Sequence, residues 1–197
     1  MIAQVTGTLV HRALDRVDIM TAGGVAYECL IPLSVYESLP AEGQPITLHT
    51  HLSVREDAWQ LFGFESPYER AVFQRLLAAK GVGPALALGV LSALTAERVV
   101  RALREKDLTT LMRVPRVGRK KAEQIILDLA DKMDLVGGAP PSAGLSASTG
   151  ADDAIRALLS LGYNQADADR AVRGAIESGV SGDVSVVVRA ALARLAS

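Results

Sequence analysis

Apolar and polar residues alternate through the first 64 residues, with the period of two that is typical of half-buried strands. One such stretch runs from Val25 to Ile31, directly after a Gly23-Gly24 turn. A second runs from Ile46 to Val54, and a third, Trp59 to Phe64, follows after only four residues. The second stretch places Ile46, Leu48, Leu52 and Val54 on one face and Thr47, His49, His51 and Ser53 on the other.

These strands and the turns between them predict a small barrel. Turn signals recur at Asp15-Arg16, Gly23-Gly24 and Glu42-Gly43, which divides residues 1–64 into about five short strands. Such a set is typical of an OB-fold. We expect Trp59, Phe62, Phe64 and the single Cys29 at core positions, and we interpret His49 and His51 as surface polarity.

The period becomes helical from Pro67 onward. Apolar stripes predict an all-helical region over residues 65–135. Residues 136–150 are almost entirely Gly, Ala, Pro, Ser, Thr and Leu, which predicts a flexible linker. Residues 151–197 then show three short amphipathic helices, separated near Gly162 and Gly179. The fold class is therefore α+β, with a barrel, a helical domain, a linker and a three-helix bundle.

The net charge of −1 conceals an uneven distribution. Residues 1–64 carry three basic and seven acidic residues, residues 65–135 carry thirteen and nine, and residues 136–197 carry five and six. The basic excess lies in the helical middle, where five basic residues occur within nine positions that contain no acid: Arg113, Arg116, Arg119, Lys120 and Lys121. Such a run is usually only a solvated face, but it also suits phosphate binding.

An internal repeat with an offset of 35 residues carries the most information. Lys80-Gly81-Val82-Gly83 follows one apolar helix end, and Pro115-Arg116-Val117-Gly118 follows another. Glycine in such a turn allows positive φ and close approach, and the next helix presents free backbone amides at its positive end. A phosphate can dock there without a side chain. We therefore expect DNA-backbone contacts from Gly81, Val82, Gly83, Val117, Gly118, Arg119, Lys120 and Lys121.

Other chemistry is hard to find in the sequence. There is no phosphate-binding G-x-x-x-x-G-K-[ST] run, no evident Ser or His nucleophile arrangement and no group of cysteines for zinc, so we expect no cofactor and no catalysis. An exposed row of aromatics for stacking single strands is not evident either. No apolar run is long enough to span a membrane and the N-terminus is not a signal peptide, so we expect a cytoplasmic protein.

The order and spacing of these features resemble the RuvA family over nearly the full length. The resemblance rests on Val54-Arg55-Glu56-Asp57, Leu61-Phe62-Gly63-Phe64 and Gly81-Val82-Gly83-Pro84, together with the second hairpin, the linker and the tail. It implies an OB-fold, tandem helix-hairpin-helix motifs and a mobile C-terminal bundle similar to ubiquitin-associated domains. It further implies a homotetramer, as one tetramer or two around the DNA, that holds an open Holliday junction in recombination and DNA repair. The implied protein partners are the RuvB ATPase and the RuvC nuclease.

The resemblance also implies roles for residues outside the hairpins. Glu56 and Asp57 would form an acidic pin that repels phosphates at the crossover, and Arg55 would anchor a phosphate beside it. Leu161-Gly162-Tyr163 resembles the exposed apolar loop through which ubiquitin-associated bundles bind, and would contact the motor.

Two positions depart from the family pattern. Ala85 replaces a residue that is commonly basic, and Arg116 replaces a usual glycine, so basic character has moved into the second hairpin. Two other functions fit parts of the sequence. One is a structure-specific nuclease with Glu56 and Asp57 as metal ligands, although no third acid lies nearby in the sequence. The other is a DNA-bending accessory protein that would bind linear duplex as tightly as a junction.

Overall fold

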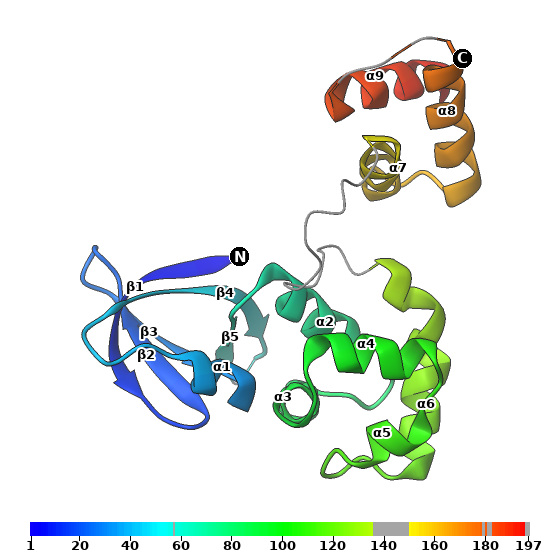
Figure 1. Cartoon of the computed structure of the whole chain (residues 1–197). Helices are drawn as coiled ribbons and strands as arrows, with labels where there is room; N and C mark the ends of the chain where they lie inside the picture. Colours follow the sequence, from blue (N-terminus) through cyan, green and yellow to red (C-terminus); the bar gives the residue numbers. More distant parts are fainter. Residues whose placement is uncertain (57, 136–149, 179, 181–182, 196–197) are drawn as a thin grey trace. The chain divides into compact units, whose positions relative to one another are not determined.

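The computed structural model describes residues 1–56, 58–135, 150–178, 180 and 183–195 (Figure 1). The chain forms two compact units, residues 1–142 and residues 143–197. Strands and the helices that follow them share the first unit, and the second is helical. This arrangement confirms the predicted α+β class. Among the helices in the described ranges, none is both long and apolar enough to cross a membrane.

Five strands close into a barrel in the order β1-β2-β3-β5-β4. The bounds are β1 (Gln4–Arg12), β2 (Arg16–Met20), β3 (Ala26–Leu30), β4 (Pro45–Val54) and β5 (Trp59–Phe64), with the short helix α1 (Leu33–Ser38) between β3 and β4. The pairing is antiparallel except between β3 and β5, which are parallel. The predicted small barrel is therefore confirmed. Inside it, burial raises the pKa of the Cys29 thiol to about 12, so this cysteine is an inert core residue.

The hairpin between β4 and β5 corrects one expected core position. Phe62 and Phe64 are fully buried, but Trp59 is 77% exposed. Its cross-strand partner Val54 is 59% exposed. Both lie at the outer end of the hairpin, beyond the strand pairs that close the barrel, so the alternation of the sequence continues where there is no core left to fill.

His51 also differs from the prediction of surface polarity. Its ring lies 5.6 Å from the ring of Phe73 and 6.5 Å from that of Phe62, and Gln74 hydrogen-bonds its Nδ1. Partial burial lowers the pKa of His51, and the charge of Arg70 lowers it further, so the ring is neutral at neutral pH. A strand face that looks solvent-facing in sequence is covered by a helix of the following segment.

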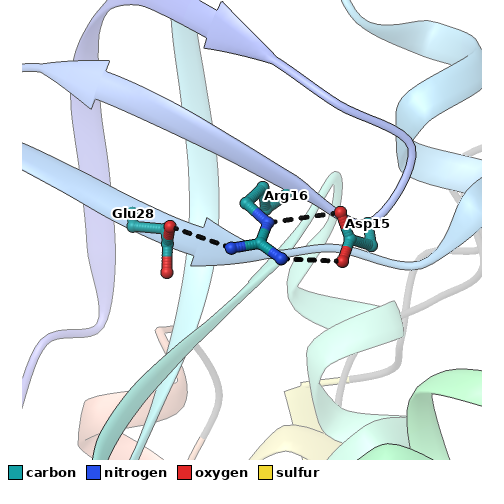
Figure 2. Close-up of polar contacts among 3 residues, drawn as sticks. All are labelled: Asp15, Arg16 and Glu28. Atoms are coloured by element: carbon teal, nitrogen blue, oxygen red, sulfur yellow. Dashed lines mark hydrogen bonds and ion pairs between the residues drawn. The ribbon is translucent and has the colours of Figure 1, made fainter.

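Arg16, at the start of β2, forms ion pairs with two acidic residues of the barrel. Its guanidinium donates to both carboxylate oxygens of Asp15, at 3.3 and 3.2 Å, and to Glu28 at 3.4 Å (Figure 2). The hydrogen bonds from Arg16 lower the pKa of Asp15. The barrel carries more acids than bases, and this cation is already shared between two of those acids.

Five α-helices and a 3-10 helix complete the first unit: α2 (Pro67–Leu77), α3 (Pro84–Ala93), α4 (Ala96–Arg104), α5 (Leu108–Met112), α6 (Arg119–Leu129) and η1 (Ala130–Leu135). Figure 1 shows α2 beside β4 and β5. Phe73 of α2 packs against Phe62 at 5.1 Å and Phe64 at 4.8 Å between ring centroids, so the outer side of β5 and the helices share one hydrophobic core, while the barrel interior has a core of its own. That shared core fixes the helical hairpins relative to the β4–β5 hairpin. The division into domains at residue 64 stays a prediction.

The second unit is a bundle of α7 (Gly150–Ser160), α8 (Gln165–Glu177) and α9 (Val184–Leu195). Its core is built from small side chains and a few aliphatic ones, including Ala154, Leu158, Val172 and Val187. The first helix begins at Gly150, which we had assigned to the linker. The rest of the predicted linker, residues 136–149, lies outside the described residues.

Candidate nucleic-acid interface

The two predicted turns have the same backbone. Residues 81 and 116 occupy equivalent positions of the 35-residue repeat, and both have positive φ: +76° for Gly81 and +68° for Arg116. In each turn the valine amide donates to a carbonyl three residues back, Val82 to Ala79 and Val117 to Val114, both at 3.1 Å. The sequence repeat is therefore a structural repeat.

The glycines that end the turns do not serve the purpose we expected. Gly83 has φ −92° and Gly118 has φ −83°, so neither needs the positive φ that glycine permits. A Cβ at either position would meet nothing within 4 Å. Glycine at these positions instead allows close approach of a ligand, because the absence of a side chain lets another molecule reach the first amides of the helix. The positive φ lies two residues earlier.

Val82 and Val117 are core residues. Both side chains are buried in the helical core, and both amides are already bonded inside their turns. Neither a side chain nor a free N–H is therefore available from these two expected DNA-binding residues. Their buried side chains pack the turns onto the helical core, so the DNA contacts predicted for the turns are left to their neighbours.

The helices that follow the turns have free N-terminal amides. Helices α2, α4, α5 and α8 begin with Ser66, Thr95, Asp107 and Asn164, and each of these side chains accepts a hydrogen bond from an amide of the first turn. Helices α3 and α6 begin with Gly83 and Gly118, which have no side chain to do so. Their first amides and their positive dipole ends are open to an anion.

The basic side chains of the second turn differ in availability. Lys120 is exposed and makes no ion pair within the described part of the chain. Arg119 pairs with Glu123 one helical turn away, at 3.0 Å, in an exposed pair that a phosphate can replace at little cost. Lys121 donates from Nζ to the carbonyl oxygen of Gly81 at 3.1 Å. Of the three expected phosphate contacts, Lys120 is therefore a free cation within the described residues, Arg119 is a paired cation, and Lys121 bridges the two turns.

Helix α6 also holds the first turn from another side. The amide of Lys80 donates to Asp128 at 2.8 Å, and Gln124 donates to the other oxygen of that carboxylate at 2.8 Å. Together with the bond from Lys121 to Gly81, these contacts fix the first turn against the helix that follows the second. The two turns therefore form one rigid structure.

One groove connects both turns to the β4–β5 hairpin. Its lining residues are Arg55, Gln60, Gly81, Gly83, Pro84, Ala85, Leu86, Gly89, Pro115, Arg116 and Lys121. The groove has cationic side chains at the barrel end and at the second turn, and its lining includes the uncapped N-terminus of α3. The uncapped N-terminus of α6 lines a second pocket, which shares Gly81, Arg116 and Lys121 with the groove. Sequence reasoning missed Gln60 and did not place Arg116 in the site. The signal was present, since Arg116 replaces a glycine in the repeat.

Two of the residues assigned to the pin and its flank lie at the tip of the β4–β5 hairpin, and the pin itself stays a prediction. Arg55 and Glu56 are exposed there, and the amide of Arg55 donates to the carbonyl of Ala58 at 2.9 Å, which closes the tip. Asp57 lies outside the described residues. Arg55 lines the groove, so the residue expected to flank the pin does lie beside the two turns.

In the second unit, the expected binding loop joins α7 to α8. Gly162 has φ +96°, which favours glycine, and this sharp turn leaves Leu161 59% and Tyr163 37% exposed. Ile176, near the end of α8, is a further exposed apolar side chain. An apolar loop of this kind is available to a protein partner.

Comparisons with known proteins cover the whole chain. Family models for the RuvA N terminal domain, a SAM-like helix-hairpin-helix tandem and the RuvA C-terminal domain match residues 1–63, 73–131 and 149–196. The chain is 73% identical to the Holliday junction branch migration complex subunit RuvA of Gemmatimonas aurantiaca, over 99% of this chain and 98% of the relative. It is 43% identical to the subunit of that name from Halorhodospira halophila, over 98% and 97%. It is 41% identical to that from Acidobacterium capsulatum, over 98% of each chain.

Proposed function

The chain belongs to the RuvA family, and we propose that it is a non-catalytic subunit that binds four-way (Holliday) DNA junctions. It holds the junction open and recruits a RuvB-type ATPase, which moves the branch point during homologous recombination and DNA repair. One observation carries the proposal: the two uncapped helix N-termini open into two pockets that have three lining residues in common. The N-terminus of α3 lines the groove that reaches the β4–β5 hairpin, and the N-terminus of α6 lines a second pocket with Arg119 and Lys120. Both pockets are lined by Gly81, Arg116 and Lys121.

The two turns grip the DNA backbone. The amides at the start of α3 and α6 donate hydrogen bonds to phosphate oxygens, and Lys120, Arg116 and Arg119 neutralise the phosphates. All of these contacts go to phosphates, so binding is independent of base sequence. Contacts of this kind suit a protein that stays bound to the junction while DNA of any sequence moves past it.

The hairpin tip separates strands. Glu56 and Asp57 repel phosphates that approach the crossover, and Arg55 attracts a phosphate on the side of the groove. A cation beside two acids on one short tip directs the backbone to one side of the hairpin. The double variant Glu56→Gln with Asp57→Asn should bind DNA at least as tightly and lose its preference for junctions over linear duplex.

Assembly follows from the geometry of the ligand. A junction has four duplex arms and the chain has one pair of turns, so four copies arranged as a homotetramer can hold all four arms. One tetramer leaves a face of the junction open to a resolving nuclease of the RuvC type, whereas two tetramers enclose both faces. The loop Leu161-Gly162-Tyr163 of the second unit binds the motor, and the complex works in the cytoplasm.

The test of this proposal measures DNA binding and the mass of the complexes that form. Full-length protein is added to a labelled four-way junction and to a linear duplex of the same sequence in magnesium, and the complexes are weighed by native mass spectrometry. We expect a shifted, uncut junction that carries four or eight copies, and weaker binding of the duplex. Cleavage of the junction would support the nuclease, and equal affinity for the duplex would support the DNA-bending protein.

The role of the tail is tested separately. A chain that ends at Leu135 retains η1 and every element of the first unit. We expect it to assemble and to bind junctions as the full chain does, but to support no motor-driven branch migration. Leu161→Ser with Tyr163→Ser in the full chain should reproduce that loss. Migration at the full-length rate by the shortened chain would contradict the assignment of motor binding to the tail.

A further inference from the structure

Trp59 is a large apolar side chain in an unexpected place. It is the only tryptophan in the chain, it begins β5 directly after the hairpin tip, and 77% of it is exposed. The aromatic residues that follow it in the strand, Phe62 and Phe64, are fully buried. An isolated leucine or valine on a surface needs no explanation, but an indole this exposed on a short polar hairpin does.

We propose that the Trp59 indole stacks on an unpaired nucleobase at the crossover of the bound junction. This inference rests on the proposed function, because it needs a junction in the groove. The chemistry is base–aromatic stacking, which tolerates any base because every base has a π-face. It therefore agrees with turns that bind phosphates without reading sequence.

The position of the ring on the hairpin supports this assignment. Side chains alternate along β5, so Gln60 faces the groove with Arg55, while Trp59 and its cross-strand partner Val54 face the other side. The hairpin thus has a face toward the DNA in the groove and an apolar face behind it. A strand that leaves the groove at the tip passes to that second face, where the indole is the first surface that a separated base meets.

The charges at the tip favour a base over a phosphate at this site. Glu56 is exposed at the hairpin tip, three residues before Trp59, and repels the backbone, while Arg55 attracts it toward the groove. A nucleotide turned in this way presents its base to the apolar face. The acids and the indole then act on the same nucleotide, with the acids excluding the phosphate and the ring holding the base.

A second copy of the chain is a poorer occupant. The exposed apolar surface here consists of two side chains, Val54 and Trp59, with charged residues next to them. Stable protein interfaces bury roughly 800 Å² on each partner, several times what this pair can offer. One flat ring at the end of a groove is instead the size of a single base.

Tryptophan emission tests the proposal directly in the full-length protein. Excitation at a wavelength where DNA does not absorb reports on Trp59 alone, because the chain has no other tryptophan. On saturation with a four-way junction, we expect quenched emission and at least a twofold drop in acrylamide accessibility. Linear duplex, which has no separated bases, should cause neither change even when it is bound.

Variants of Trp59 test the contribution of the indole to DNA affinity. Trp59→Ala should weaken junction binding roughly tenfold and leave duplex binding within about twofold, whereas Trp59→Phe keeps a ring and should retain most of the affinity. Val25→Ala removes another exposed apolar side chain, at the β2–β3 turn, and is the matched control with wild-type binding. The fluorescence test needs no variant, so it stands even if Trp59→Ala distorts the hairpin.

Three results would overturn the proposal in distinguishable ways. Protection of the indole from acrylamide in the free protein would show that a second copy covers it. Unchanged emission on saturating junction, with tight junction binding, would reject stacking and leave the proposed function intact. A failure to bind the junction at all would reject both.

Discussion

The first and second turns of the helical region have one backbone and two chemistries. Both place a positive φ two residues before the N-cap, a buried valine next, and a bare glycine at the N-cap. The first turn follows that geometry with Pro84 and Ala85, and the second follows it with Arg119 and Lys120. The packing of the valines fixes the geometry, and only the side chains around the N-terminus distinguish the two.

The difference extends to the backbone amides. Pro84 has no N–H, so the start of α3 offers the amides of Gly83 and Ala85, whereas α6 offers those of Gly118, Arg119 and Lys120. The second turn therefore has one more donor and more basic side chains, because the first turn has only Lys80 where the second has Arg116, Arg119 and Lys120. The comparison indicates that one turn can position a duplex through weak contacts while the other supplies most of the binding energy.

Charge reversal at equivalent positions should give the largest effect. Lys120 and Ala85 are 35 residues apart in the repeat, and both are exposed. We expect Lys120→Glu to weaken junction binding at least roughly 30-fold, about 2 kcal/mol, because it removes a charged phosphate contact and adds repulsion. Ala85→Glu adds the same negative charge but removes no contact, and should cost clearly less. Fluorescence anisotropy with a labelled junction measures both, and equal losses would contradict the asymmetry.

The converse change should make the turns more alike. Ala85→Lys places a cation where the second turn has Lys120, and we expect affinity to rise about tenfold at low salt. The slope of log affinity against log salt should steepen by roughly one unit, since one more phosphate is neutralised. Titrations at several salt concentrations check both numbers. An unchanged slope would mean that DNA does not approach the first turn closely enough to contact residue 85.

Backbone strain should make a smaller difference between the two turns, and here the first turn has the advantage. Gly81 adopts φ +76° without strain, but Arg116 holds φ +68° with a side chain. Arg116→Gly should therefore stabilise the first unit by about 0.5–1 kcal/mol, and Gly81→Ala should destabilise it by a similar amount. Thermal unfolding of the full chain measures the shift. Arg116→Gly should bind DNA more weakly at the same time, because Arg116 lines the groove; a variant that loses stability would contradict the strain argument.

The repeat shows how much a sequence can predict and where it fails. The offset of 35 residues, the turn positions and the helices after them could be read directly, because glycine, proline and apolar spacing are local signals. The roles inside the turn could not. Val82 and Val117 looked like contact residues because they lie in the motif, yet their burial depends on helices far away in the sequence.

The β4–β5 hairpin shows a second kind of failure. Alternation correctly predicted the faces of β4, but it could not tell where the barrel ends, so Trp59 was assigned to a core that stops at the pair of Leu52 and Leu61. The same alternation wrongly predicted that His51 faces solvent, because a helix covers the outer side of the strand. Periodicity indicates which residues share a face, whereas the neighbours of that face come from tertiary packing.

Lys121 should produce the smallest effect and the sharpest contrast with its neighbour. Sequence reasoning grouped it with Lys120 as a phosphate contact, but its Nζ donates to Gly81 of the other turn at 3.1 Å. Lys121→Met keeps the aliphatic stem and removes this bond, so we expect the first turn to open more easily by about 0.5–1 kcal/mol. Hydrogen exchange at residues 79–83 should accelerate a few-fold. Lys120→Met is the control, which should weaken DNA binding and leave exchange in the first turn unchanged. If both variants instead lowered the salt slope equally and neither altered exchange, Lys121 would be a second phosphate contact, and the two turns would be coupled through the bond from Lys80 to Asp128 alone.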